Sequence, residues 1–490
     1  MTNQVPLTGS QHAVSLAPGY TLCAPGLEGE ARKVEASPQT RSAQAINPDD
    51  QRLLVALHRG GVGVEAQFEI DITSVARTRG AAAVDPPAAL EFKTPPSPDN
   101  IQTVVFYTDE NGVSQWIWPT TTGAEDTTFH LPVEKENLPQ AAITGSRGAI
   151  TAGIRKVVNV LSWATDELVG DLAEGFVKKW EERNRPYGLY YVQPGNFEEA
   201  AVPWAQMTGG RALLLLHGTF STGNGAFAGL LKSDWMKKLA EHYEGRIFAF
   251  NHPTLHHSPA ENVQELLRIL PPEVKNLDLD LVTHSRGGLV GRELCERFNV
   301  LNTTDKRIRV HRAVFVAGPN NGTILTSKDH WMQLIDAYTN LLVGLPDNPY
   351  TITMEALVTL IKVVGGGTLQ ALPGLQAMLP GGEAIKALNA APKPETRYYA
   401  LAAHYQPTDE HALRRFGKSL LMQAIGKIFE EDSDLVVPTK GCYGMDPAAA
   451  GFPVPETQRK VYGAEADTNH LNFFEKEPVN QQLYDWLSAT

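Results

Sequence analysis

The stretch LDLDLVTHSRGGLVGREL, residues 277–294, changes its pattern at a short turn. Its first part, LDLDLVTH, is the apolar run of a buried strand, and GGLVGREL has the apolar spacing of a helix. The turn between them is THSRG, Thr283 to Gly287. A strand that passes directly into a helix is the unit of a parallel sheet covered by helices. We therefore expect Ser285 to stand at the carboxyl end of a strand, where such sheets place their sites.

The same alternation continues on both sides of this stretch. Strand patterns recur in RALLLLHGTF, GRIFAFNHP, RIRVHRAVFVAGP and TRYYALAAHY, and helical patterns separate them. One of these helices begins with a capping box formed by Ser258 and Glu261, with Pro259 in its first turn. This alternation predicts an α/β fold with a doubly wound, mostly parallel sheet and helices on both faces.

The first 145 residues follow a different pattern. Residues 1–50 are rich in Ser, Pro, Gln and Ala, and they predict a loose N-terminal arm. Residues 51–145 contain the alternating segment VEAQFEIDI and the hairpin pattern QTVVFYTDENGVSQWIWP, which turns at Asn111-Gly112. Short strands separated by Pro and Gly predict a small all-β, sandwich-like domain, which we interpret as a structural or binding module.

A helical connector is predicted within residues 146–200. Apolar residues between Ile154 and Arg183 recur mostly at i, i+4 spacing. The polar face of this helix is acidic, and anionic lipids would repel it. Packing on a neighbouring domain is therefore favoured over a membrane surface.

The composition narrows the classes of function. A length of 490 residues predicts two or three domains, and a net charge of -12 argues against a nucleic-acid partner. Three distant cysteines give no disulfide framework and no metal spacing, which favours a reducing compartment. We see neither a secretory signal nor a transmembrane segment, and expect a cytoplasmic protein, although signal-free export is also compatible with the sequence. The oligomeric state is not indicated.

Ser285 has the setting of a nucleophile on a tight strand-to-helix turn. Such a turn is usually written Gly-x-Ser-x-Gly, because small residues two positions away avoid clashes. Gly287 fits this pattern, whereas Thr283 stands where the first glycine is expected. The helix that follows offers backbone N–H groups, which favour developing negative charge. The alternative is an ordinary turn that carries a serine by chance.

A second loop carries the complementary signal for acyl transfer. The strand RALLLL is followed by His217, Gly218 and Thr219. In acyl-transfer enzymes of this architecture, a backbone N–H from this loop and the N–H of the residue after the nucleophile hold the oxyanion. We therefore expect the backbone N–H groups of Thr219 and Arg286 to form an oxyanion hole.

A serine nucleophile needs a base, and the base needs an orienting acid. The expected chain order of serine, acid and histidine is met by Ser285, Asp434 and His470. Asp432 and Asp467 are alternative acids. Metal binding at the histidines of NHPTLHHSP is disfavoured because adjacent side chains point apart. The sequence predicts no metal or organic cofactor, and His284 is expected to pack or to line the site.

The segments LLLLHGTFS, LVTHSRGGLV, VFVAGPNNGT, DLVVP and NHLNFF together resemble the serine lipases and esterases of the α/β-hydrolase superfamily, and its bacterial lipase-like branch above all. The resemblance covers roughly residues 205–490. Residue by residue it implies Ser285 as nucleophile, His470 as base and Asp434 as acid. It also implies Thr219 and Arg286 as oxyanion donors. A catalytic domain of residues 201–490 follows from it.

A helical insertion is predicted at about residues 325–395, between GPNNGT and TRYYALAAHY. It is strongly apolar, and Gly365, Gly366 and Gly367 interrupt it as a hinge. Lipase-like enzymes use such caps to cover an acyl pocket, and an apolar cap favours an apolar acyl chain. The alternative is a cap that is packed and immobile.

These observations predict a carboxylic-ester hydrolase that acts on a small-molecule or lipid-like ester through an acyl-enzyme. A phospholipase or an acyltransferase with the same three residues is an alternative, because the choice of acceptor depends on pocket shape. A catalytically inactive hydrolase fold that serves as an interaction protein is another. The natural ester and the role of the β domain are not indicated by the sequence.

Overall fold

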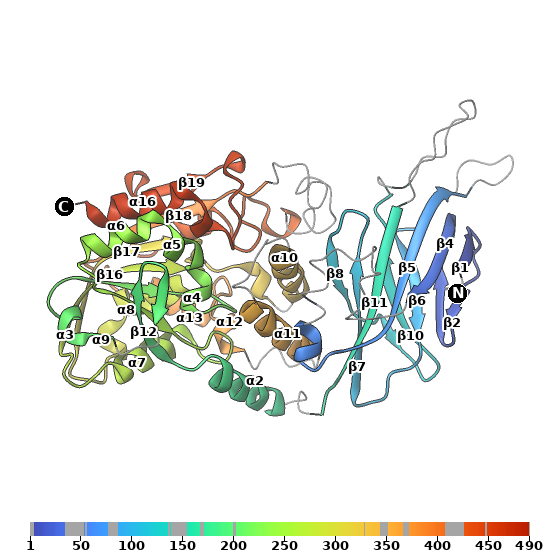
Figure 1. Cartoon of the computed structure of the whole chain (residues 1–490), viewed down its shortest axis with the longest axis horizontal. Helices are drawn as coiled ribbons and strands as arrows, with labels where there is room; N and C mark the ends of the chain where they lie inside the picture. The colour runs from blue at the N-terminus through green and yellow to red at the C-terminus, as the bar shows by residue number, and fades with distance from the viewer. Residues whose placement is uncertain are drawn as a thin grey trace. The chain divides into compact units, whose positions relative to one another are not determined.

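The computed structural model describes residues 4–34, 53, 56–76, 87–135, 138, 154–166, 171–198, 202–327, 329–343, 351–365, 372–406, 426–445 and 448–489 (Figure 1). The chain divides into two compact units. The β unit is built on Met1–Glu167, and the α/β unit on Leu168–Asp409 and Ala424–Thr490.

The β unit consists of two antiparallel sheets that share one apolar core. The six-stranded sheet has the order β1-β4-β5-β11-β7-β8, and the five-stranded sheet has the order β2-β3-β6-β10-β9. Phe68 and Val158 of the first sheet and Phe92 and Phe129 of the second belong to the same buried cluster. The strands are β1 (Gln4–Thr8), β2 (Val14–Ala17), β3 (Tyr20–Cys23), β4 (Leu27–Val34), β5 (Gly63–Val75), β6 (Ala89–Thr94), β7 (Ile101–Thr108), β8 (Ser114–Ile117), β9 (Thr121–Thr122), β10 (Thr127–Pro132) and β11 (Ile154–Ala164).

Three segments of the β unit form strands as predicted. VEAQFEIDI lies in β5, and the two halves of the predicted hairpin form β7 and β8, in which Thr108 pairs with Ser114. Gly112 has a φ of 78° at the turn of this hairpin, a conformation that glycine adopts without strain. The side chain of Asp109 accepts hydrogen bonds from the N–H groups of Asn111 and Val113 and fixes the turn.

The prediction of a loose arm is wrong for the described part of residues 1–50. Strands β1 to β4 lie there, and they join both sheets. Leu7, Leu16, Leu22 and Leu27 are buried in the shared core. The Ser- and Pro-rich composition concealed these strands because each of them contributes only one or two apolar side chains. Residues 35–50 lie outside the described residues.

The prediction of one helix from Ile154 to Arg183 is also wrong in its first part. Residues Ile154–Ala164 form β11, which pairs with β5 on one side and β7 on the other. A strand that is buried on both faces has a continuous apolar run, which helical spacing imitates. Among the described residues of this span, the helical part is α2 (Asp171–Asn184).

The α/β unit is built around one eight-stranded sheet of order β13-β12-β15-β14-β16-β17-β18-β19. The pairs from β15 to β19 are parallel, and β12 is antiparallel to both β13 and β15. The strands are β12 (Gly188–Gln193), β13 (Asn196–Glu198), β14 (Ala212–Leu216), β15 (Ile247–Asn251), β16 (Asn276–His284), β17 (Arg307–Val316), β18 (Arg397–Ala403) and β19 (Arg459–Tyr462).

Helices cover both faces of this sheet, as the alternation of patterns predicted. In β14, Leu214 and Leu216 pack in one cluster with side chains of α7 and α8, whereas Leu213 and Leu215 pack in another with α5, α6 and α16. The helices are α5 (Ala228–Lys232), α6 (Asp234–His242), α7 (Pro259–Ile269), α8 (Gly287–Glu296) and α16 (Glu477–Ser488). The capping box of Ser258 and Glu261 is present at the start of α7. The fold is therefore α/β and doubly wound.

The predicted start of this unit at residue 201 is too late. Strands β12 and β13 precede it and form one edge of the sheet. They were not predicted, since a short edge hairpin of mixed polarity has no distinctive period. The short strand β19 was missed for the same reason.

The segment between β17 and β18 is helical, in agreement with the prediction for residues 325–395. It contains α10 (Trp331–Val343), α11 (Thr351–Gly365), α12 (Pro373–Gln376) and α13 (Glu383–Asn389). Of the predicted glycine hinge, Gly365 ends α11, and Gly366 and Gly367 lie outside the described residues. We refer to residues 325–395 as the helical insertion.

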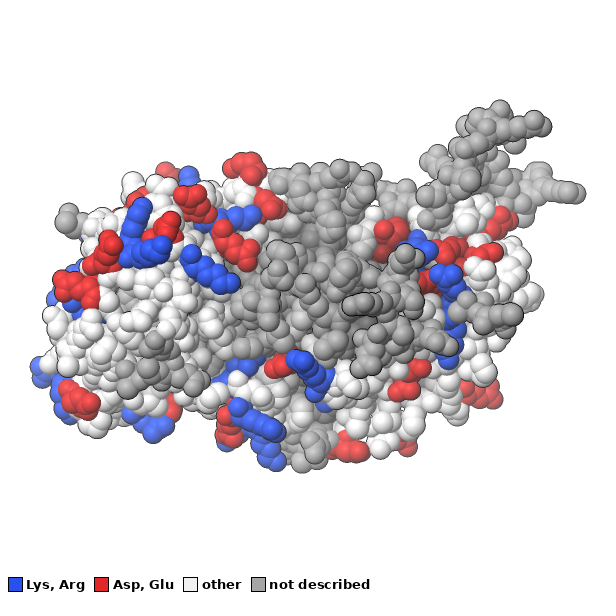
Figure 2. Space-filling view, viewed as in Figure 1, with Lys and Arg blue, Asp and Glu red and all other residues white. Residues whose placement is uncertain are grey.

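Charged side chains of both signs are mixed on the described surface seen in Figure 2, and Lys and Arg do not gather into an extended patch on that face. None of the described helices is long and apolar enough to cross a membrane.

Candidate active site

Ser285 stands directly between β16 and α8, at the carboxyl end of a central strand. Its φ of 52° lies in the left-handed region, which is costly for a residue other than glycine. The N–H of Ser285 donates to the carbonyl of Val316 (2.9 Å), and its carbonyl accepts from the N–H of Gly288 (2.8 Å). These bonds hold the turn in its strained form.

Glycines make room for this turn on each side. A Cβ on Gly218 would lie 2.5 Å from Cβ of Ser285, and a Cβ on Gly287 would lie 2.3 Å from the carbonyl oxygen of Leu216. The threonine in place of the first glycine is accommodated by a glycine one turn into α8. A Cβ on Gly291 would lie 3.0 Å from Cγ2 of Thr283. Thr283 therefore fits because its methyl group packs against Gly291.

The structure brings Ser285, His470 and Asp434 together. Nε2 of His470 lies 2.9 Å from Oγ of Ser285, and Nδ1 lies 2.8 Å from Oδ2 of Asp434. The other carboxylate oxygen of Asp434 accepts the N–H groups of Val436 (3.0 Å) and Val437 (2.8 Å). With the ring proton on Nδ1 facing the carboxylate, Nε2 is left to accept the serine proton.

All three side chains are buried, with exposures of 2% for Ser285, 0% for His470 and 1% for Asp434. Low water access strengthens the electrostatic interactions among them.

The two alternative acids lie elsewhere. Asp432 faces His404 (3.4 Å), and Asp467 faces Lys476 (3.4 Å). Both of these pairs are partly exposed. Asp434 is thus the carboxylate that meets His470.

Thr219 and Arg286 are placed on the two sides of Ser285. Thr219 follows Gly218, which approaches the Ser285 side chain, and Arg286 is the residue after the serine. Within the described part of the chain, neither backbone N–H has a hydrogen-bond partner. Two free N–H groups next to the serine hydroxyl can stabilise an oxyanion.

The side chain of Arg286 fixes this turn through hydrogen bonds to neighbouring segments. It is fully buried and donates to the carbonyls of Gly374 (2.8 Å) and His257 and to Oδ1 of Asn262 (3.0 Å). Burial lowers its pKa to about 10, so it stays charged at neutral pH. The sequence did not reveal this role, because the two carbonyls and the Asn262 side chain are distant from Arg286 along the chain.

A buried carboxylate orders the loop that Arg286 contacts. Glu181 of α2 accepts the N–H groups of Thr254 (2.6 Å), Leu255 (2.8 Å) and His256 (2.7 Å). Burial raises the pKa of Glu181, and these three donors oppose the shift. Helix α2, which sequence patterns described only as a connector, therefore supports the loop next to the site.

His284 packs beside the serine, as expected. Its Nε2 donates to the carbonyl of His470 (2.9 Å), which fixes the backbone of that residue. Burial lowers the pKa of His284 to about 3, so its ring is neutral at ordinary pH. His284 thus positions His470 and is not itself suited to be the base.

The helical insertion reaches the site at two points. Oγ1 of Thr219 lies 3.8 Å from Sδ of Met378, and the ring of Tyr338 packs edge-on against the ring of His470, with centroids 5.9 Å apart. Sequence reasoning missed Tyr338, because a tyrosine in an apolar helix carries no signal of function.

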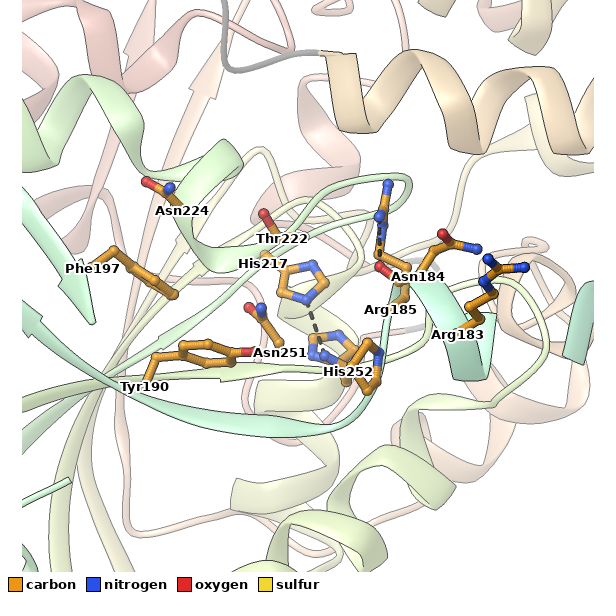
Figure 3. A pocket seen from close by; sticks show the side chains of 11 residues that line it. Arg183, Asn184, Arg185, Tyr190, Phe197, His217, Thr222, Asn224, Asn251 and His252 are labelled. Carbon is orange, nitrogen blue, oxygen red and sulfur yellow. Dashed lines mark hydrogen bonds between the residues drawn. The ribbon is translucent and has the colours of Figure 1, made fainter. Parts of the chain in front are cut away.

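A cavity of about 390 Å³ opens at the carboxyl ends of β14 and β15 (Figure 3). His217 and His252 stack in its wall, with centroids 4.1 Å apart, and Nε2 of His217 accepts the N–H of His252. Burial lowers the pKa of His217 to about 3 and that of His252 well below its usual value. Both rings are therefore neutral and suit binding rather than proton transfer.

Among the described residues, no group of three or more His, Cys, Asp and Glu side chains is arranged to hold a metal ion. Of the histidines of NHPTLHHSP, His252 stacks on His217, and His256 packs edge-on against His257.

The sequence profile of one family, a domain of unknown function (DUF7379), matches residues 184–488. The chain belongs to this family. The matched span includes Ser285, Asp434 and His470, together with the helical insertion. No curated protein is significantly similar to the chain in sequence.

Several solved structures are remotely similar to this family member. Lipase 1 from Pelosinus fermentans is 14% identical, with 57% of this chain and 99% of the lipase covered and a TM-score of 0.37. A lipase from Bacillus licheniformis is 14% identical (57% and 92% covered, TM-score 0.32). The Staphylococcus hyicus lipase is 11% identical (58% and 96% covered, TM-score 0.34). The fold of the α/β unit is assigned from its own strand order.

Proposed function

We propose that the α/β unit is a serine hydrolase that cleaves carboxylic esters. The observation that carries the proposal is the chain of hydrogen bonds from Ser285 to His470 to Asp434, at the end of a central parallel strand. The backbone N–H groups of Thr219 and Arg286, which have no hydrogen-bond partner among the described residues, flank the serine. This is the arrangement that acyl transfer requires.

The reaction proceeds in two stages. Oγ of Ser285 bonds to the ester carbonyl carbon while His470 Nε2 takes the serine proton. The N–H groups of Thr219 and Arg286 stabilise the negative charge on the carbonyl oxygen. The carbon–oxygen bond to the alcohol then breaks, and His470 returns its proton to that alcohol. Water repeats these steps on the acyl-enzyme and releases the acid.

Asp434 holds the imidazole ring and stabilises its charged form. Its second oxygen is already saturated by Val436 and Val437, so the first oxygen is directed at His470. Met378 of the insertion lies beside Thr219, and an apolar lining of this kind favours an ester with an apolar acyl group.

The test is hydrolysis of p-nitrophenyl esters from acetate to palmitate by the wild type and by Ser285→Ala. We expect the variant to lose roughly a thousandfold or more in kcat, and labelling by a fluorophosphonate to disappear. The preferred chain length identifies the acyl group, and a competing alcohol detects acyl transfer. Equal activity of the two proteins would exclude Ser285 as the nucleophile, and lack of any ester hydrolysis and labelling in the wild type would favour an inactive hydrolase fold.

A further inference from the structure

Tyr338 of α10 is a buried side chain at the reacting atoms, to which the steps above give no role. Its side chain is 2% exposed. Its ring meets His470 edge-on, with centroids 5.9 Å apart and an interplanar angle of 82°. On its other side it meets Phe220 at 4.9 Å and 88°. Tyr338 is thus fixed between the base and the loop that carries Thr219.

The hydroxyl group of Tyr338 lies near that of Ser285, whose influence on the pKa of Tyr338 is opposite to that of burial. The proton of Ser285 is directed at Nε2 of His470, so the serine oxygen keeps lone pairs that can accept another hydrogen bond. Burial raises the pKa of Tyr338 above its usual value, and it therefore keeps its proton throughout the working range of a serine hydrolase. The phenol is accordingly available as a donor to an oxygen that gains negative charge beside it.

We propose that Tyr338 is a further catalytic residue, whose hydroxyl donates a hydrogen bond to the negative charge of the tetrahedral intermediate during the reaction. The proposal rests on the proposed ester hydrolysis. Tyr338 transfers no proton. As the bond from Oγ to the carbonyl carbon forms, the serine proton moves to His470 and the carbonyl electron pair moves to its oxygen, which Thr219, Arg286 and Tyr338 then stabilise together.

This role gives the helical insertion a part in the reaction itself. A helix that merely covers a site can move away without consequence for the chemistry. A helix that supplies a donor must stay in place while the intermediate forms. The insertion is then part of the catalytic centre. The edge-on contacts with His470 and Phe220 hold the phenol in position.

The test compares Tyr338→Phe with Tyr462→Phe. The first variant removes only the hydroxyl and keeps the ring that packs on His470. The second is a matched control on β19, where the hydroxyl donates to the carbonyl of Pro478 (3.0 Å), away from the site. Active sites are counted from the amount of fluorophosphonate bound at completion, so kcat refers to folded enzyme only. We expect Tyr338→Phe to lower kcat and the rate of phosphonylation by roughly a hundredfold with little change in KM, and Tyr462→Phe to match the wild type.

Two results would overturn the proposal. An unchanged rate in Tyr338→Phe would show that the ring only packs, and a faster rate would show that the hydroxyl obstructs the serine. Ser285→Ala separates this from the proposed function itself. If Ser285→Ala is inactive and Tyr338→Phe is not impaired, only the role of Tyr338 fails. If Ser285→Ala stays active, both fail.

Discussion

The β unit and the α/β unit both bury polar side chains, but they place them at different points along their strands. In the β unit, Lys156 lies within β11, opposite Ile70 of β5, and is 0% exposed. Its ammonium group pairs with Glu110, which lies in the turn after β7. In the α/β unit, all residues of β14 are apolar and buried, and the polar side chains begin with His217 just beyond its end.

This difference separates buried polar groups that stabilise the fold from buried polar groups that are placed to react. The buried charge of Lys156 within an antiparallel strand is enclosed by its neighbours and is neutralised by one partner, Glu110. Polar groups that follow parallel strands gather at one edge of the sheet, where groups from several strands meet and a substrate can approach. The comparison predicts that polar substitutions will affect stability in the β unit and reaction rate in the α/β unit.

The largest expected effect is that of Asp434→Asn on ester hydrolysis. The N–H groups of Val436 and Val437 will retain the amide oxygen in the place of Oδ1, so the amide NH₂ will face His470 Nδ1. That nitrogen must then be the unprotonated one, and Nε2 can no longer accept the serine proton. We expect kcat to fall by roughly 10⁴-fold with an unchanged melting temperature. Activity near that of the wild type, measured on the preferred p-nitrophenyl ester, would assign the acid elsewhere.

The second largest expected effect is a loss of stability of the β unit in the variant Lys156→Met. Burial alone would lower the pKa of Lys156, but Tyr107 and Glu110 raise it, so the ammonium group keeps its charge. Removal of the cation leaves Glu110 buried without compensation, which costs roughly 3–5 kcal/mol. Hydrogen exchange in β7 and β11 should accelerate while ester hydrolysis stays constant.

The double variant Lys156→Met/Glu110→Leu is the control for this prediction. It should recover most of the loss, because no charge remains buried. Failure of the second substitution to restore protection would attribute the effect to the lost packing of the lysine stem instead.

A smaller effect concerns the pH dependence of the β unit. Burial raises the pKa of Asp109 to about 7, and Glu110 and Glu134 add to the shift. Between the unfolded pKa, near 4, and pH 7 the folded state binds more protons than the unfolded state. The contribution of Asp109 to stability is therefore lost as the pH rises through this window.

Asp109→Asn removes this proton linkage and keeps an oxygen for the N–H groups of Asn111 and Val113. Relative to the wild type, we expect the variant to gain on the order of 2 kcal/mol between pH 5 and pH 8, measured by urea unfolding. A stability difference that does not vary with pH would show that Asp109 titrates normally.

The sequence allowed much of the candidate site to be predicted. Ser285 was found because its strand, turn and helix are contiguous. Asp434 and His470 were found from their order along the chain. Thr219 and Arg286 followed from the ends of two strands that the sequence marks clearly. The hydrogen bonds that join Ser285 to His470 and His470 to Asp434 were beyond prediction, as were the unavailability of Asp432 and Asp467.

Other parts of the site carried no sequence signal. Glu181 supports the loop that begins at Thr254 from a helix that local spacing described only as a connector. Gly291 compensates for Thr283 through a contact that exists only once α8 packs on β16. Tyr338 comes from the helical insertion. The apolar spacing of this segment indicates that it is buried, but it does not indicate which residues the segment packs against.

The sequence alone determined the order of buried strands and helices in the α/β unit, and with it the place of Ser285. These features depend on periodicity and turn chemistry among near neighbours. Tertiary structure decided that Ile154–Ala164 is a strand, since an apolar run becomes β only when β5 and β7 offer their hydrogen bonds on both sides. It also decided which groups meet Ser285, because His470 lies 185 residues away along the chain and only the packed sheet brings them within 2.9 Å.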